Sequence, residues 1–340
     1  MPILPTPAYQ PPFPFTNGHV QTLYPTLWRR VGGIVPQRER ITTADGDFVD
    51  IDWHYSISGT TKKLAIVSHG LEGNSRKSYP LGMARHLCHL GWDVICLNFR
   101  GCSGEPNRLP RMYHSGLTND LHAVIVHGLA TRRYETAALI GFSMGGNQTL
   151  KYLGENPGKV PDEVQAAVVF SVPCDLAESV AVMDRWCNSI YMRYFMGSLK
   201  AKIREKARLF PGVFDLTDLE KIRTFVPFDD RYTAPLHGFR DAADYYHRCS
   251  ASQFLPTIRL PSLIVQAADD PFLSSSSYPL AEARHNPCLH LEMPRYGGHV
   301  GFVAPNRHGA YWSEIRAGSF LMNICRLKRC NSSAGCKKLE

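Results

Sequence analysis

Residues 139–146 read Leu-Ile-Gly-Phe-Ser-Met-Gly-Gly, and Gly141–Gly145 within them form the pattern G-x-S-x-G. An apolar, β-branched run precedes this pattern, and a sequence typical of a helix follows it. A serine on such a sharp strand-to-helix turn has a strained backbone, and glycine neighbours let other chain segments approach it closely. The turn would raise the hydroxyl of Ser143 above the carboxyl end of a sheet. A short pattern also occurs by chance, so its meaning depends on the rest of the chain.

Short apolar segments alternate with helical patterns along most of the chain. Residues 40–54 alternate around Asp45-Gly46, which predicts a β-hairpin. Further strands are predicted over residues 64–68, 93–99, 136–142, 164–172, 262–267 and 289–293, with helices over 79–90, 117–130 and 144–155. Continuous apolar strands separated by helices indicate a mostly parallel sheet that is covered on both faces. The sequence therefore predicts an α/β fold.

Three segments stand outside this alternation. Residues 1–35 are rich in proline and aromatic residues, which predicts an extended N-terminal arm over the domain surface. Residues 175–255 are rich in aromatic residues and methionine, and they predict a helical cap insertion between two strands of the sheet. The apolar side chains of this cap form its own core or line a substrate pocket. Residues 327–340 form a basic tail, so the α/β core comprises 36–174 and 256–326.

Composition and charge exclude several classes of protein. The 340 residues are 44% hydrophobic and 20% charged, as in soluble globular proteins. The formal net charge of +8 comes with no nucleic-acid motif, so it predicts a solvated surface or weak peripheral contact with anionic lipid. The N-terminus has no basic region that leads into an apolar one, so we expect no signal peptide. Because no stretch reaches about 18 apolar residues, we expect no stable membrane anchor. Nothing in the composition indicates an oligomeric state.

Cysteine usage and the glycine pattern bear on location and cofactors. The ten cysteines show no C-x-x-C spacing, which fits reduced thiols and predicts a cytoplasmic protein. The chain has no phosphate-binding glycine fingerprint and no convincing metal-ligand spacing. We therefore expect neither a cofactor nor a metal.

A serine nucleophile needs a base, a group that orients the base, and donors for the oxyanion. In an α/β-hydrolase sheet these follow in the order serine, acid, histidine, each after a strand. The strand that begins at Ser262 leads into Asp269-Asp270-Pro271, and the spacing favours Asp270 as the acid. Asp269, which is also placed to cap a helix, and Asp175, after the preceding strand, remain alternatives.

The base and the oxyanion donors follow from the same logic. His299 lies in Tyr296-Gly-Gly-His-Val-Gly-Phe302, directly after the last predicted strand. The glycines around it allow a backbone path that brings the imidazole to Ser143. The oxyanion needs two backbone N–H groups, and we predict those of Met144, after the nucleophile, and Leu71, after the strand that ends at His69-Gly70.

The combined motifs resemble one family, the YheT-type α/β-hydrolases. The resemblance runs from about residue 10 to about residue 325 and rests on Asn17–Thr22, His69–Ser75, Asn98–Glu105, Tyr113–Gly116, Gly141–Asn147, Asp269–Pro271 and Gly297–Phe302. It implies a carboxylesterase in which Ser143, Asp270 and His299 match the catalytic triad of the family. Eukaryotic relatives include medium-chain ester synthases and lipases, several with an N-terminal membrane anchor.

The leading hypothesis is a serine carboxylic-ester hydrolase. It would act through an acyl-enzyme on small-molecule esters with short- to medium-chain apolar groups. Transfer of the acyl group to an alcohol and a lipase-like activity use the same acyl-enzyme and remain alternatives. A non-catalytic binding protein with the hydrolase fold is a third hypothesis. Serine at the turn argues against epoxide hydrolase or dehalogenase chemistry, which requires a carboxylate nucleophile.

Overall fold

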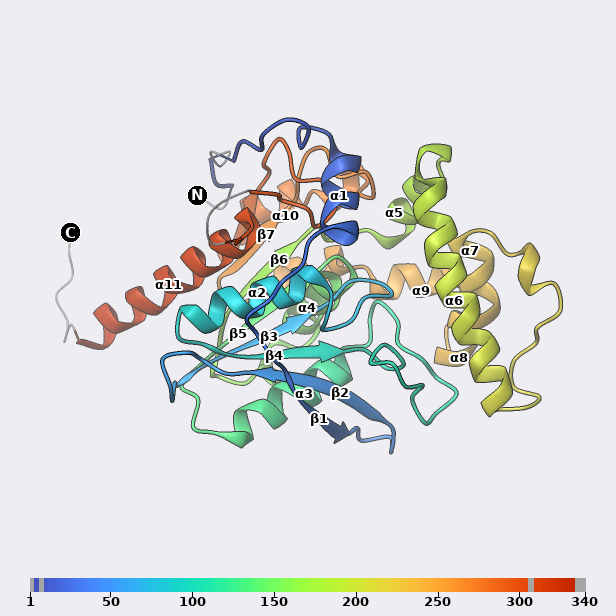
Figure 1. The fold of residues 1–340 in the computed structure, drawn as a ribbon, viewed down its shortest axis with the longest axis horizontal. Coiled ribbons are helices and arrows are strands. Elements are labelled where there is room, and N and C mark those ends of the chain that lie inside the picture. The colour runs from blue at the N-terminus through green and yellow to red at the C-terminus, as the bar shows by residue number, and fades with distance from the viewer. Residues whose placement is uncertain (1–2, 6–8, 305–308, 334–340) are drawn as a thin grey trace.

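The computed structural model describes residues 3–5, 9–304 and 309–333, with side chains up to residue 326. Its centre is an eight-stranded sheet with the strand order β1-β2-β4-β3-β5-β6-β7-β8 (Figure 1). From β4 to β8 every neighbouring pair is parallel. These strands are β3 (Lys63–Ser68), β4 (Asp93–Asn98), β5 (Thr136–Phe142), β6 (Val164–Phe170), β7 (Ser262–Val265) and β8 (Leu289–Glu292).

The predicted hairpin forms one edge of the sheet. Strands β1 (Gln37–Thr42) and β2 (Phe48–His54) are antiparallel, with Thr42 opposite Phe48. Between them Gly46 has φ of 80°, a left-handed conformation that glycine adopts without strain. β2 then pairs antiparallel with β4, so the hairpin joins the parallel sheet directly.

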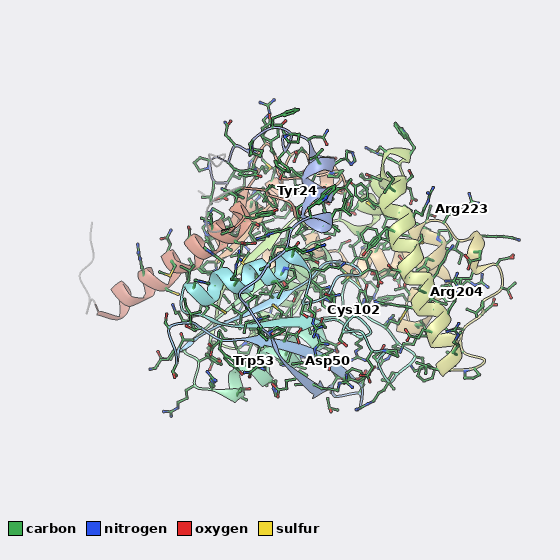
Figure 2. The ribbon with its side chains drawn as sticks, in the orientation of Figure 1. Tyr24, Asp50, Trp53, Cys102, Arg204 and Arg223 are labelled. Carbon is green, nitrogen blue, oxygen red and sulfur yellow. The ribbon has the colours of Figure 1, made fainter. Side chains whose placement is uncertain are left out.

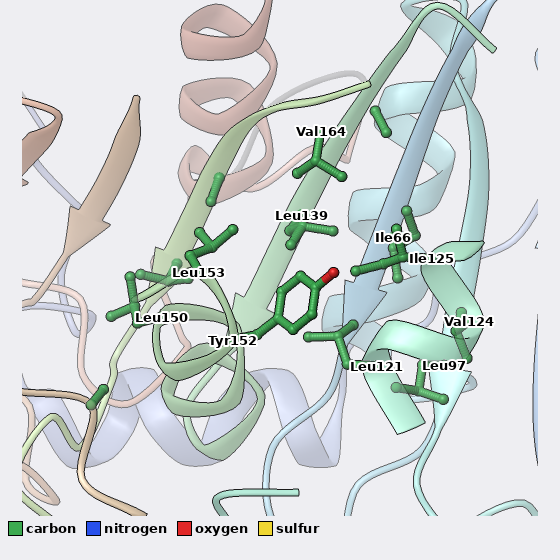
Figure 3. Packing of buried hydrophobic residues seen from close by; sticks show 14 of the residues in the cluster. Ile66, Leu97, Leu121, Val124, Ile125, Leu139, Leu150, Tyr152, Leu153 and Val164 are labelled. Carbon is green, nitrogen blue, oxygen red and sulfur yellow. The ribbon is translucent and has the colours of Figure 1, made fainter. Parts of the chain in front are cut away.

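Helices cover both faces of the sheet, as the continuous apolar strands predict. One face carries α2 (Ser78–His89) and α11 (Trp312–Ser333), whose apolar residues join one buried cluster with the strands. The other face carries α3 (Thr118–Thr131) and α4 (Met144–Glu155). Figure 3 shows this second core, with side chains of α3 and α4 packed against those of the central strands. A smaller helix, α10 (Leu280–His285), connects β7 to β8.

The segment between β6 and β7 contains only helices. It comprises α5 (Leu176–Met183), α6 (Ser189–Leu209), α7 (Phe225–Phe228), α8 (Ala234–His237) and α9 (Ala242–Cys249), joined by short 3-10 and π-helical turns. Figure 1 shows α6, α7 and α8 standing to one side of the sheet. Methionine and aromatic side chains of this segment form a hydrophobic cluster of their own. We use the word cap for residues 175–255.

Both ends of the chain differ from the sequence-based expectation. The N-terminal arm is not extended throughout, because residues Gly18–Leu27 form helix α1. The prolines concentrate before it, and the Asn17 side chain accepts hydrogen bonds from the first free N–H groups of the helix. At the other end α11 continues to Ser333, so the predicted basic tail begins inside a helix. Residues 334–340 of that tail lie outside the described residues.

Candidate active site

Ser143 occupies the turn between β5 and α4, as its sequence pattern predicts. Its φ of 52° and ψ of −121° lie outside the conformations that L-residues favour. Glycine is required beside it for steric reasons. A Cβ added to Gly145 would lie 2.5 Å from the His69 carbonyl oxygen, and one added to Gly141 would lie 2.5 Å from Gly146 Cα. The tight turn therefore holds the Ser143 hydroxyl clear of α4.

The structure brings Ser143, His299 and Asp270 into one hydrogen-bonded chain. His299 Nε2 is 2.8 Å from Ser143 Oγ, and His299 Nδ1 is 3.0 Å and 3.1 Å from the two carboxylate oxygens of Asp270. A carboxylate only accepts, so Nδ1 carries the proton and Nε2 is free to accept from the serine. The Phe272 N–H donates to Asp270 Oδ1 at 2.9 Å, which fixes the buried carboxylate.

The two alternative acids have other partners. Asp269 Oδ1 accepts a hydrogen bond from the Gly298 N–H at 2.8 Å and does not contact the imidazole. Asp175 caps α5 and accepts from the Glu178 N–H at 3.2 Å. Of the three carboxylates, only that of Asp270 hydrogen-bonds to His299.

The loop after β3 passes directly beside the nucleophile. A Cβ added to Gly70 would lie 3.1 Å from Ser143 Cβ. In this loop the N–H groups of Gly70, Glu72 and Gly73 all donate hydrogen bonds within the protein. Within the described part of the chain, the N–H of Leu71 has no such partner. This group is therefore available to a bound oxygen.

Met144 supplies a second available N–H group. It is the first residue of α4, and the first N–H groups of a helix have no partner within the helix. Across residues 3–5, 9–304 and 309–333 no acceptor is hydrogen-bonded to it. The positive end of the helix dipole also lies here and favours negative charge. The N–H groups of Leu71 and Met144, the two oxyanion donors predicted from the sequence, thus both lack a hydrogen-bond partner among the described residues.

His69 shapes the same loop, a role that sequence reasoning missed. Its buried ring donates from Nδ1 to the Gly70 carbonyl oxygen at 2.7 Å and accepts from the Phe99 N–H at 3.2 Å through Nε2. Burial lowers the pKa of His69 to about 3, so its imidazole is neutral at physiological pH. The sequence placed His69 at the start of the loop that supplies the Leu71 N–H but gave its side chain no role.

Helix α1 packs behind the loop that carries His299. Thr22 Oγ1 accepts a hydrogen bond from the His299 N–H at 2.9 Å, and Gln21 Oε1 accepts from the Val303 N–H at 2.8 Å. Gln21 is fully buried. These contacts join residues more than 270 positions apart in the chain. The only signal for them in the sequence is the motif Asn17–Thr22.

Glycines allow α1 and the histidine loop to touch backbone to backbone. A Cβ added to Gly18 would lie 2.0 Å from the Asp269 carbonyl oxygen. One added to Gly298 would lie 2.3 Å from the Gly18 carbonyl oxygen, and one added to Gly301 would lie 2.3 Å from that of Gln21. Any larger residue at these positions would displace the loop. The N-terminal helix is therefore part of the support of the triad.

A cavity of about 140 Å³ opens above Ser143 and His299, between the core and the cap. Its lining is mainly apolar and includes Leu71, Met112, Leu176, Val180, Met183, Phe195, Leu199, Phe225, Phe228, Phe272 and Leu273. The aromatic and methionine residues of the cap that line the cavity are Met183, Phe195, Phe225, Phe228, Tyr245 and Tyr246. Others pack within the cap, while Trp186 is 88% exposed.

One acidic side chain also lines this cavity. Asp229 begins the π-helical turn of the cap, and its carboxylate accepts hydrogen bonds from the hydroxyls of Thr233 and Tyr246. Burial raises the pKa of Asp229 to about 6, although both hydrogen bonds oppose the shift. The cavity is thus mainly apolar, and the carboxylate and ammonium groups in its wall are those of Asp229 and Lys202.

The serine lies on a strand-to-helix turn and begins a hydrogen-bonded Ser–His–Asp chain, with two free N–H groups nearby. This arrangement at the carboxyl ends of parallel strands defines an α/β hydrolase. The family model described as "alpha/beta hydrolase fold" matches residues 66–304, and the chain belongs to this family. No helix among the described residues has both the length and the apolar character needed to cross a bilayer.

Relatives narrow the family further. The chain is 36% identical over 320 residues to the Escherichia coli K12 protein named "Putative esterase YheT", covering 93% of each chain, which confirms the YheT-type resemblance. It is 32% identical over 306 residues to the mouse protein named "Phospholipase ABHD3", covering 83% of this chain and 74% of the relative. A solved esterase structure from Pyrococcus furiosus shares the fold, with a TM-score of 0.59, 17% identity and coverage of 87% and 96%.

Proposed function

We propose that the protein is a serine carboxylesterase that cleaves small esters with apolar acyl groups. The observation that carries this proposal is the Ser143–His299–Asp270 hydrogen-bonded chain at the base of a mainly apolar cavity. The names of the relatives, an esterase and a phospholipase, agree with chemistry on ester bonds.

The proposed reaction has two halves. Ser143 Oγ attacks the ester carbonyl carbon while His299 Nε2 accepts the serine proton, and Asp270 stabilises the imidazolium. The N–H groups of Leu71 and Met144 bind the oxyanion of the tetrahedral intermediate. The intermediate expels the alcohol, which receives its proton from His299. Water, activated by the same imidazole, then releases the acid and restores the free serine.

Acyl-chain length is the direct test of the substrate class. Because the cavity is small and apolar, activity on p-nitrophenyl esters is expected to rise from acetyl to a maximum between butanoyl and octanoyl. It should fall again for palmitoyl, whose chain cannot be enclosed. The measurement is kcat/KM across the series. A maximum at acetyl with no activity at octanoyl would contradict the apolar acyl site.

Two alternatives use the same residues. An alcohol that replaces water in the second half-reaction would make the protein an acyltransferase, and the mainly apolar lining of the cavity favours the binding of an alcohol with an apolar chain. Product analysis at rising ethanol concentration separates esterase from acyltransferase activity, because free acid alone at every concentration would eliminate transfer.

A non-catalytic binding protein would leave Ser143 unlabelled by a fluorophosphonate probe. Lipase-like activity, the cytoplasmic location and peripheral lipid contact remain predictions.

The contact between α1 and the histidine loop leads to a further prediction. Thr22→Val keeps the shape of the side chain but removes the acceptor of the His299 N–H, leaving a partly buried donor unpaired. Such a loss costs about 1–3 kcal/mol, and we expect kcat to fall by roughly 10-fold with a lowered Tm. Thr26→Val, on an exposed position one turn later in α1, is the control and should change neither quantity. Equal kinetics for both variants would remove Thr22 from the support of the triad.

A further inference from the structure

Lys202 reaches from cap helix α6 into the core. Its Nζ donates to Glu72 Oε1 at 2.7 Å and to Cys102 Sγ at 3.0 Å. It also lies 5.0 Å from the centre of the Tyr113 ring. In Figure 2 Cys102 lies on the side of the core that faces α6. The side chain of Lys202 is 18% exposed and that of Glu72 is 4% exposed, so this ion pair is largely removed from water.

Glu72 directly follows Leu71, whose N–H is a proposed oxyanion donor. Its φ of 52° is in the left-handed region, which a residue with a long side chain adopts only where the surroundings hold it. Those surroundings are visible here. The Tyr113 hydroxyl donates to Glu72 Oε1 at 2.6 Å and accepts from the Glu72 N–H at 3.0 Å. Together with Lys202, Tyr113 therefore holds both the backbone and the side chain of Glu72.

The energetics make this contact a strong one. Burial alone would lower the pKa of Lys202, but Cys102 and Glu72 outweigh burial and raise it. The ammonium group therefore keeps its charge at neutral pH. Removing one partner of a largely buried ion pair leaves an uncompensated charge, which destabilises the folded state. The pair thus strongly favours the conformation in which α6 packs against the core, which we call the seated conformation.

A second lysine of α6 offers a comparison. Lys206, one turn further along, is also buried and donates to the carbonyl oxygens of Asn107 and Leu109 at 2.7 Å and 2.6 Å. It joins the cap to the core as Lys202 does. Its partners lie in the loop after β4, which also carries Cys102, but Lys206 does not reach Glu72 in the loop after β3, and it does not line the cavity. Of the two lysines, Lys202 is the one that contacts the loop beside Ser143, through Glu72.

We propose that the Glu72–Lys202 ion pair is a positioning element that couples the seating of cap helix α6 to the orientation of the Leu71 N–H. The proposal rests on the esterase function proposed above. When α6 is seated, Lys202 holds Glu72, and the nearby Gly70–Leu71 peptide then points the Leu71 N–H toward the oxyanion position. A substrate that holds the cap on the core thereby favours the loop conformation that stabilises its own transition state. Neither side chain touches the reacting atoms, so both are positioning residues.

The first test compares two lysine variants on the same helix. Lys202→Met is expected to lower kcat by about 10- to 100-fold with little change in KM, because an oxyanion donor acts mainly in the transition state. Lys206→Met also removes a buried cap-to-core contact, made to backbone carbonyls instead of a carboxylate, and should lower Tm while kcat stays within about 2-fold, because Lys206 does not contact Glu72. Steady-state kinetics are measured below the Tm of both variants. Equal losses of kcat in the two variants would overturn the proposal.

A double variant separates positioning from stability. Glu72→Gln/Lys202→Met removes both buried charges, so its Tm should recover relative to Lys202→Met. If the tie itself orients the loop, kcat should not recover with Tm. Parallel recovery of both would show that the single variant acted only through an unpaired charge, which would overturn the proposal.

Hydrogen exchange gives a readout that does not depend on turnover. Backbone amides of residues 70–73 are expected to exchange faster in Lys202→Met than in the wild type. Their exchange rates should be unchanged in Lys206→Met. Unaltered exchange in Lys202→Met would overturn the coupling even in an active esterase. Faster exchange in a protein whose wild type cleaves no ester would support the coupling and reject the proposed function instead.

Discussion

Ser143→Ala is expected to lower kcat/KM for p-nitrophenyl butyrate by about 10⁴- to 10⁶-fold, the range seen when the nucleophile of a serine hydrolase is removed. Alanine retains the Cβ of serine, so the strained turn at φ 52° and its packing against Gly70 should persist. The loss therefore reports chemistry and not folding. The measurement is steady-state hydrolysis after subtraction of the uncatalysed rate.

Two controls accompany this variant. Its Tm should match that of the wild type, because the Ser143 Oγ hydrogen bond to His299 is the only interaction removed from the described site. Covalent labelling by a fluorophosphonate probe should disappear together with the activity. Wild-type turnover in Ser143→Ala would show that another residue attacks the ester, and the proposed mechanism would be rejected.

Asp270→Asn is expected to lower kcat by about 10³- to 10⁴-fold, because an amide no longer holds His299 in the tautomer whose Nε2 accepts the serine proton. The variant is nearly isosteric, and an amide oxygen can still accept the Phe272 N–H that now fixes the side chain. A normal Tm with a large loss of kcat would therefore separate orientation of the base from stability of the loop.

Asp269→Asn is the matched control for this experiment. The Oδ1 of the neighbouring carboxylate accepts from the Gly298 N–H, which an amide oxygen can also do. Because Asp269 does not reach the imidazole, we expect kcat to change by less than about 10-fold. A larger loss in Asp269→Asn than in Asp270→Asn would make Asp269 the orienting acid and would contradict the geometry described above.

Features that depend on neighbouring residues were predictable from the sequence. The alternation of apolar strands and helices indicated a mostly parallel sheet, because burial on both faces leaves a direct trace in the residue pattern. The hairpin followed from alternation around Asp45-Gly46, and the elbow followed from glycines that a tight turn requires. The order of Ser143, Asp270 and His299 along the chain also carried information, since each follows a strand that ends at the same edge of the sheet.

The spacing after the strand favoured Asp270 as the acid, but the order of residues along the chain did not exclude Asp269 or Asp175. All three follow strands, and adjacent residues of a loop point in different directions that depend on the whole loop. The structure separates them by distance, because only Asp270 lies within 3.1 Å of His299 Nδ1. The composition of residues 1–35 likewise favoured an extended arm, yet tertiary contacts of Gln21 and Thr22 accompany a helix there.

The sequence by itself determined the α/β architecture, the serine elbow and the strand ends at which its partners lie, because periodicity and turn chemistry are local properties. Only the tertiary structure decided how these parts are held. The Thr22–His299 contact joins residues 277 positions apart, and the Glu72–Lys202 pair joins residues 130 positions apart. Such contacts depend on how complete elements pack and on burial of charge and hydrogen-bonding groups, which leave no periodic trace in the chain.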